Sequence, residues 1–218
     1  MSGLSPCAGN YALAQALSEA LPSDRPGLFH PYVTPCVHDA PGNTPARKLE
    51  RLASHLACEP SMILVGEAPG YQGCRTSGVA FTSERLLMEG AIPRILQEPA
   101  RLSTRRLPFS EPSATIVWRV LYELGLAEHV VLWNAVQLHP HRGDPWTNRT
   151  PTDAELELGR DAIGLLVEAF PAAQVIAIGR KAEATLQGMG ITVAGAVRHP
   201  ANGGATKFRD GLRALARA

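Results

Sequence analysis

Three side chains that can donate, accept or transfer protons stand at the ends of short apolar runs. Glu67 follows "MILVG", Asn134 ends "VVLWN", and His199 follows "VAGAVR". A carboxylate at the mouth of a buried strand is costly to desolvate, so the site must either hydrate it or use it. Each residue alone could be an ordinary loop or capping residue. Their shared position favours one site that contains all three.

These residues depend on elements that alternate between strand and helix patterns. Short apolar runs predict strands at 62–67, 130–134, 174–179 and within 191–200. Helices are expected over 11–21, from Pro45, after Ser83, over 113–125, after the Thr152–Glu155 capping box, up to Gly188 and over 206–217. The alternation predicts an α/β fold, a three-layer α/β/α sandwich around a short, mainly parallel four-stranded sheet. Ligands bind at the carboxyl ends of such strands, where the three side chains lie.

Length and composition fit one compact domain. The 218 residues, 45% of them apolar, can fill a sizeable core, with residues 1–60 as an N-terminal helical extension packed on it. No apolar run approaches the roughly 20 residues that span a bilayer, and no basic segment followed by an apolar one opens the chain. We therefore expect a cytoplasmic monomer. Because the net charge is only +1, a polyanion would have to be held by a local patch.

The cysteines and histidines argue against a metal site. Cys7, Cys36, Cys58 and Cys74 are far apart in the sequence and form no CxxC pair, so reduced, structural thiols are expected. His139 and His141 have a spacing that could hold a metal, but nothing nearby in the sequence supplies further ligands. His141 is better placed to contact a phosphate.

Three segments, in order, resemble the motifs of the uracil-DNA glycosylase superfamily. "GEAPG" (66–70) with "SGVAFTSERLL" (77–87) is similar to the first motif of the family-four enzymes, and the segment 133–157 resembles their "TNVVKCRPPxNRTPTPEE" stretch. "HPANGG" (199–204) resembles the second superfamily motif, a loop that contains His-Pro. The likeness extends over about 62–209.

The chain departs from family four at the cysteines that hold an iron–sulfur cluster there. Two of those positions are Leu138 and Gly159 here, and the N-terminal CxxC is missing. The resemblance therefore implies a divergent branch that has the active-site motifs without the cluster, and no cofactor is expected.

The resemblance implies a role for each motif residue. Asn134 would pair with the uracil edge, Phe81 would stack on the base unless it is only a core residue, and His199 would donate to O2 of the departing uracil. Glu67 would orient or deprotonate water. In other families the activating residue comes one position later, at Ala68 here, so Glu67 would act through a water at longer reach or share the work with the backbone. The expected catalytic residues are Glu67 and His199, and the expected substrate-binding residues are Gly66, Ala68, Pro69, Gly70, Tyr71, Phe81 and Asn134.

Two parts of this prediction leave alternatives open. Tyr71 could close the pocket where the methyl group of thymine would lie, or it could be a surface tyrosine. The loop after His199 offers only small residues at first, so the bulky wedge that fills the gap left by a flipped base must come from elsewhere or be missing. Basic and polar residues that flank the motifs are expected to contact DNA: His141, Arg142, Asn202, Gly203, Lys207 and Arg209, with Arg101, Arg105, Arg106 and Arg149 as further candidates.

The sequence thus predicts a monofunctional glycosylase that acts on single- or double-stranded uracil-containing DNA and releases free uracil. No lysine occupies a motif position that would suggest a lyase. The alternative is a non-catalytic or weakly active binder of uracil-containing or abasic DNA on the same fold. A general nucleotide-binding enzyme is disfavoured because neither GxGxxG nor GxxxxGK[ST] occurs.

Overall fold

A parallel sheet lies at the centre of the computed structural model, which describes residues 6–217. Its four strands run in the order β3–β2–β5–β6: β2 (Met62–Gly66), β3 (Val130–Asn134), β5 (Gln174–Ile178) and β6 (Gly195–Val197). The register pairs Gly66 with Asn134, so the two predicted motifs meet at the same edge of the sheet. All four strands were predicted, because each is a short apolar run.

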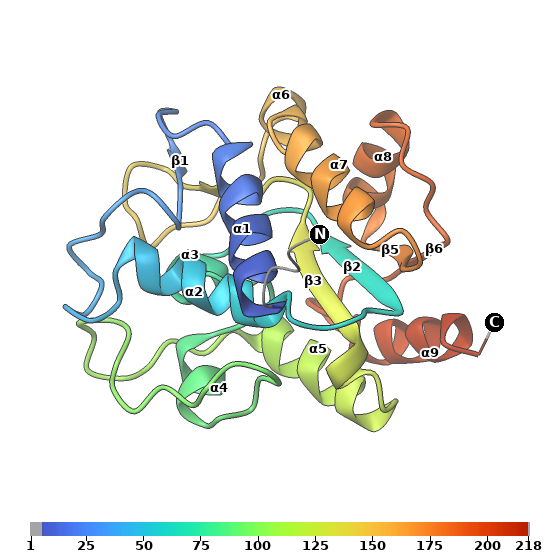
Figure 1. Ribbon diagram of the computed structural model, residues 1–218, viewed down its shortest axis with the longest axis horizontal. Helices are drawn as coiled ribbons and strands as arrows, with labels where there is room; N and C mark the ends of the chain where they lie inside the picture. The colour runs from blue at the N-terminus through green and yellow to red at the C-terminus, as the bar shows by residue number, and fades with distance from the viewer. Residues whose placement is uncertain (1–5, 218) are drawn as a thin grey trace.

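The helices alternate with these strands along the chain and lie around the sheet (Figure 1). They are α1 (Pro6–Glu19), α2 (Pro45–His55), α3 (Cys74–Ser77), α4 (Glu84–Met88), α5 (Pro112–Glu123), the 3-10 helix η1 (Ala127–His129), α6 (Asp153–Glu157), α7 (Arg160–Ala169), α8 (Arg180–Gly188) and α9 (Ala205–Leu215). A further short antiparallel pair joins β1 (Leu28–Phe29) to β4 (His139–Pro140), which the sequence did not predict. This pair ties the N-terminal part to the loop that follows Asn134.

Alternate residues of the strands face two separate cores. Leu64, Leu132 and Ile176 pack against α4, α5 and α9, whereas their neighbours Val65 and Trp133 pack against α1, α2, α7 and α8. Side chains of a strand alternate between its faces, and both faces here are apolar because both are covered. The predicted three-layer α/β/α architecture is confirmed.

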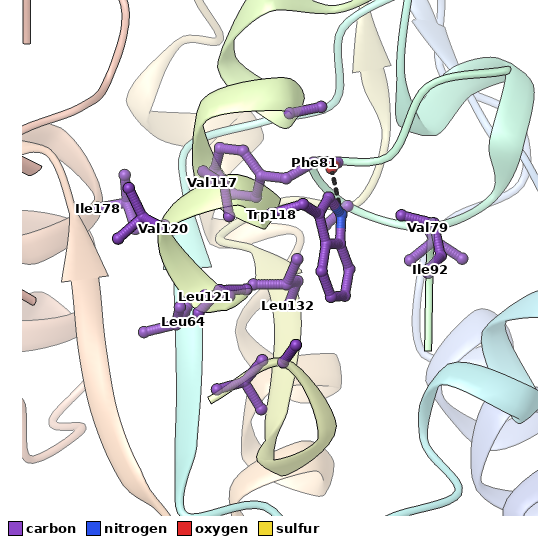
Figure 2. Packing of buried hydrophobic residues seen from close by; sticks show 14 of the residues in the cluster. Leu64, Val79, Phe81, Ile92, Val117, Trp118, Val120, Leu121, Leu132 and Ile178 are labelled. Carbon is purple, nitrogen blue, oxygen red and sulfur yellow. Dashed lines mark hydrogen bonds between the residues drawn. The ribbon is translucent and has the colours of Figure 1, made fainter. Parts of the chain in front are cut away.

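The first core also holds the segment that carries Phe81. Trp118 of α5 is buried and donates its indole N–H to the carbonyl oxygen of Phe81 at 2.9 Å, as the dashed line in Figure 2 shows. Phe81 has a φ of 49°, a left-handed backbone conformation that is uncommon for a bulky residue. Such a conformation persists where its surroundings impose it, and Trp118 is part of those surroundings.

Three local predictions can be compared with the elements. The capping box is confirmed, because the Thr152 side chain accepts from the backbone of Glu155 and the Glu155 side chain accepts from the backbone of Thr152. The helix predicted after Ser83 begins at Glu84 with Ser83 as its N-cap residue, although the Ser83 side chain makes no capping hydrogen bond. The helix after the capping box divides into α6 and α7 at Gly159, where a Cβ would lie 1.7 Å from the carbonyl oxygen of Ala135.

The N-terminal part is packed on the sheet. Ala14 and Leu17 of α1 belong to the same core as Ile63 of β2 and Leu52 of α2. Residues 1–5 of the predicted N-terminal extension lie outside the described residues. None of the helices in the described range 6–217 has the length and apolar character needed to cross a membrane.

Candidate active site

A pocket of about 550 Å³ opens at the carboxyl ends of the strands, a size typical of small-molecule sites. Nine of the predicted site residues line it: Glu67, Ala68, Pro69, Gly70, Phe81, Asn134, Arg142, His199 and Asn202. The three side chains at the ends of the apolar runs therefore do belong to one site. Arg149, a further candidate for DNA contact, also lines it, and residues that the sequence did not single out as site residues complete the wall: Cys74, Glu111, Ser113, Asn148, Thr150 and Pro151.

Gly66 brings the aromatic ring and the amide of this pocket together. A Cβ at Gly66 would lie 2.6 Å from Cζ of Phe81 and 2.8 Å from Oδ1 of Asn134, so both side chains press on its Cα. Real Cβ atoms do not come so close, which means that only glycine permits this approach. Gly66 was predicted to bind substrate, but it lies outside the pocket lining. Its contribution is the close packing of Phe81 and Asn134.

A hydrogen bond to Gln137, on the side away from the pocket, fixes the Asn134 side chain. It is 3% exposed, and its Nδ2 donates to Oε1 of Gln137 at 2.7 Å. An amide nitrogen carries two hydrogens, so one N–H and the Oδ1 atom stay available for a ligand in the pocket. Within the described part of the chain, no hydrogen bond uses this Oδ1.

His199 is neutral and has a fixed tautomer. Its Nδ1 accepts the backbone N–H of Ala201 at 3.2 Å, so the ring hydrogen is on Nε2. Burial lowers the pKa of His199 below its usual value, with the charge of Arg198 as a smaller cause. The ring lies 6.2 Å from the Phe81 ring, centroid to centroid. His199 therefore offers a neutral N–H donor beside the aromatic wall.

Glu67 is paired with a lysine that the sequence analysis did not single out. Nζ of Lys181 lies 3.6 Å from Oε1 of Glu67 and donates to the carbonyl oxygen of Pro151 at 2.8 Å. The same Oε1 is buried and accepts no hydrogen bond from the described residues. The Glu67 side chain as a whole is 34% exposed, so its other carboxyl oxygen can accept a hydrogen bond from water. Lys181 lies just after β5, at the edge of the sheet where ligand-binding residues are expected.

Glu111 adds a second carboxyl group to the pocket wall. Its Oε1 accepts from the hydroxyl of Ser113 at 2.5 Å, and its Oε2 lies where a Cβ of Gly73 would be, 1.8 Å from that position. Burial raises the pKa of Glu111, which favours the neutral acid. No sequence signal pointed to this residue, because a Glu before a Pro at the start of a helix is commonplace.

Several predicted residues lie away from the pocket. The Tyr71 ring packs edge-on against Phe109 with 5.7 Å between centroids, and only its backbone N–H reaches a lining residue, Asn148. Of the predicted DNA-binding residues, His141, Gly203, Lys207 and Arg209 are outside the lining. His141 stacks on His139 at 5.7 Å, and burial lowers its pKa. Lys207 is exposed on α9, whereas Arg209 contacts Asp210 at 3.4 Å.

Four aromatic side chains and one arginine form a cluster beside the pocket, which we call the rim cluster: His38, Tyr71, Phe109, Trp146 and Arg105. The Phe109 and Trp146 rings are 6.0 Å apart, His38 is 4.5 Å from Trp146, and the Arg105 guanidinium lies 4.4 Å from the Phe109 centroid. Trp146 is 37% exposed. Tyr71, Phe109 and Trp146 are each within two residues of a lining residue, so the cluster lies next to the pocket mouth.

The described side chains do not assemble a metal site. Across the part of the chain that the structure describes, no three His, Cys, Asp or Glu side chains are grouped to hold an ion. Leu138 is a core residue, and Gly159 has no space for a side chain. Cys36, Cys58 and Cys74 are free thiols, and burial raises the pKa of Cys74 far above its usual range. The side chain of Cys7 lies outside the described residues.

The fold and the pocket define an α/β protein with a pocket of small-molecule size where its strands end. The model of the uracil DNA glycosylase superfamily matches residues 53–216, so the chain belongs to this superfamily. Among solved structures, the crystal structure of wild-type Pedobacter heparinus SMUG2 is similar, with a TM-score of 0.66 and 15% sequence identity over 99% of this chain and 100% of that one. This likeness shows a shared fold. No curated protein matches the chain. The narrower resemblance to family four stays a prediction.

Proposed function

We propose that the protein hydrolyses the N-glycosidic bond of deoxyuridine in DNA, releasing uracil and leaving an abasic site. The observation that supports this most directly is the convergence of Asn134, Phe81, His199 and Glu67 on one pocket of nucleotide size. The protein would act as a single-domain cytoplasmic monomer. Its side chains can perform each step without a metal or a nucleotide cofactor.

Base recognition would be performed by Asn134 and Phe81. A base inside a duplex is out of reach, so the nucleotide must swing into the pocket at a cost of a few kcal/mol. The free Oδ1 of Asn134 can accept the N3–H of uracil while the free N–H donates to O4. The Phe81 ring offers a stacking surface worth ~1–3 kcal/mol. Because Gly66 lets ring and amide meet, both contacts can be made by one base.

Bond cleavage would be assisted by His199 and Glu67. As the glycosidic bond breaks, negative charge builds on uracil, and the neutral Nε2–H of His199 can donate to O2 as an oxyanion-hole group. Positive charge builds on the sugar carbon, which the Glu67 carboxylate can stabilise while it orients or deprotonates the attacking water. Lys181 pairs with Glu67 at 3.6 Å without hydrogen-bonding its buried Oε1.

Hydrolysis is favoured over a lyase reaction. A lyase needs an amine that attacks the sugar carbon. Lys181 is the lysine beside Glu67, but its Nζ is occupied by the Pro151 carbonyl and the Glu67 carboxylate, and it lies outside the lining set.

A non-catalytic DNA binder is the second candidate, because the loop after His199 has no bulky wedge. Asn202 and Gly203 are exposed in this loop and both have positive φ. If the wedge is absent, the enzyme would act best on single strands. In both cases DNA would contact Arg142 and Asn202 at the pocket, with Trp146 and Arg105 of the rim cluster beside it.

The test uses single- and double-stranded oligonucleotides that carry one uracil, with matched thymine and cytosine strands as controls. After incubation and alkaline treatment, strand breaks in the uracil lanes alone are the expected result. Borohydride added to a parallel reaction should trap no covalent complex. DNA binding without strand breaks would replace the enzyme with the binder, and a trapped adduct would replace hydrolysis with a lyase reaction.

A further inference from the structure

A chain of buried hydrogen bonds lies behind the Asn134 amide. Nδ2 of Asn134 donates to Oε1 of Gln137 at 2.7 Å, and Nε2 of Gln137 donates to the Tyr32 oxygen at 3.1 Å. The Tyr32 hydroxyl then donates to the carbonyl oxygen of Gly78 at 2.8 Å. The three side chains are at most 5% exposed. Neither Tyr32 nor Gln137 lines the pocket, and neither takes part in the chemistry proposed above.

The donor-to-acceptor direction of these hydrogen bonds is set by the Gly78 carbonyl, at the end that is farthest from the pocket. A backbone carbonyl can only accept, so the Tyr32 O–H must point to Gly78. The Tyr32 oxygen then has only lone pairs to offer Gln137, which must turn its NH2 group toward it. This places the Gln137 oxygen against Asn134. Because that oxygen can only accept a hydrogen bond, Asn134 must turn its own NH2 group toward it. Each amide therefore has one orientation, fixed by its partner.

The orientation of Asn134 decides which base its free edge fits. With Nδ2 tied to Gln137, the amide offers an acceptor to position 3 of a pyrimidine and a donor to position 4. Uracil has a donor at N3 and an acceptor at O4, whereas cytosine has the reverse. We propose that Tyr32 and Gln137 are positioning residues that select uracil over cytosine by fixing which way round Asn134 faces the base. This inference rests on the proposed function.

The opposite orientation of both amides would be complementary to cytosine, but it cannot form without the loss of a buried hydrogen bond. If Asn134 turned over, Gln137 would have to turn as well and present its oxygen to Tyr32. The Tyr32 hydroxyl would then donate to Gln137 and leave the Gly78 carbonyl unpaired in the protein interior. One lost buried hydrogen bond changes an equilibrium by roughly tenfold or more. This factor adds to the mismatch that cytosine meets at the pocket itself.

The groups of the chain keep their hydrogens at neutral pH. Burial raises the pKa of Tyr32 well above its usual value, and it raises the pKa of Cys74 as well. Cys74 is relevant because its Sγ lies 3.3 Å from Nε2 of Gln137 and takes the second N–H. Sulfur is a weak partner that can also donate through its S–H, so Cys74 tolerates either orientation of Gln137. Only the link through Tyr32 to Gly78 enforces the direction.

The experiment removes that link and measures base choice. The Tyr32→Phe variant keeps the ring and loses the hydroxyl. Tyr122→Phe is the matched control, because the Tyr122 hydroxyl also donates to a backbone carbonyl, that of Ala91 at 3.0 Å, on the exposed side of α5. Substrates are oligonucleotides with 5-fluorouracil or 5-fluorocytosine. The electron-withdrawing fluorine speeds release of both bases and leaves the hydrogen-bonding atoms of their recognition edges in place, so that slow cytosine release becomes measurable.

We expect Tyr32→Phe to slow uracil release only a few-fold and to lower the uracil-to-cytosine rate ratio by roughly tenfold or more. Gln137→Met, which removes both links, should change the ratio in the same direction. The control should keep the wild-type ratio. A purely structural role would lower both rates together and leave the ratio unchanged, and that result in folded variants would overturn the inference. A wild-type protein that releases no uracil would instead refute the proposed function.

Discussion

Replacing Gly66 by alanine tests whether the close approach of Phe81 and Asn134 creates the base pocket. The new Cβ would start 2.6 Å from Cζ of Phe81, whereas ordinary contacts begin at 3.4 Å, so the ring or the strand must move by about 0.8 Å. Asn134 is displaced in the same way, from 2.8 Å. A misplacement of ~1 Å at a reacting group can cost ~10²-fold in rate. We expect single-turnover uracil excision to fall by about that factor.

The stability of the same variant separates local displacement from unfolding. Overpacking a core typically costs ~1–3 kcal/mol, which for a chain of this length lowers Tm by roughly 2–12 °C. Gly164→Ala is the matched control, because Gly164 is in the middle of α7 and no described atom outside the adjoining backbone of this helix lies within 4 Å of the added Cβ. That control should keep full activity and gain up to ~1 kcal/mol. A folded Gly66→Ala protein with near wild-type excision would refute the assignment of the pocket to Phe81 and Asn134.

Four further predictions follow from the charges and protonation states of buried groups. Glu67→Gln should slow excision by roughly 10²–10⁴-fold in single-turnover assays, and an unchanged rate would remove Glu67 from the mechanism. His199→Ala should cost on the order of 10²–10³-fold, and because burial lowers its pKa, the wild-type rate should not depend on protonation of His199 above pH 7. Burial lowers the pKa of His55 and His139 from 6.5 to about 3, so the unfolded state binds protons first as the pH falls. Urea unfolding should therefore show about 2 kcal/mol lost per histidine between pH 7 and 5, with a shallower slope in His139→Gln. Burial raises the pKa of Glu111, so its ionisation destabilises the fold at high pH; Glu111→Gln should be more stable than the wild type at high pH and lose that advantage at low pH, and parallel pH–stability curves would contradict this.

Two features could be predicted from the sequence because they follow from short-range patterns. One is the sheet, and the other is the clustering of the three polar residues at the ends of its strands. A buried parallel strand must be a continuous apolar run, and the fold class follows from alternation of such runs with helices. Once the strands are parallel, the residues after them share an edge. Glu67, Asn134 and His199 meet for that reason, and no information on side-chain packing is needed.

The partners of these residues could not be predicted, because they come from distant parts of the chain. Tyr32 is 105 positions away from Gln137, and its hydroxyl reaches Gly78 across another 46. Glu111 reaches the pocket because Gly73 has no side chain in its way. These two residues belong to separate loops. Tyr71 was left open between pocket and surface, and its contact with Phe109 again joins two loops. Local sequence patterns do not predict such long-range contacts.

The protonation states of the pocket fit the charge that the proposed reaction creates. His199 is a neutral donor, the pKa of Glu111 is shifted toward the neutral acid, and the Cys74 thiol keeps its proton. Uracil enters as a neutral base and leaves as an anion, so ionised acids around it would oppose the departure, whereas neutral donors assist it. In the proposed reaction the Glu67 carboxylate would act at a different place, beside the sugar, where positive charge builds up. Lys181, whose Nζ lies 3.6 Å from Oε1 of Glu67, partly offsets that negative charge and so lessens its repulsion of the leaving base.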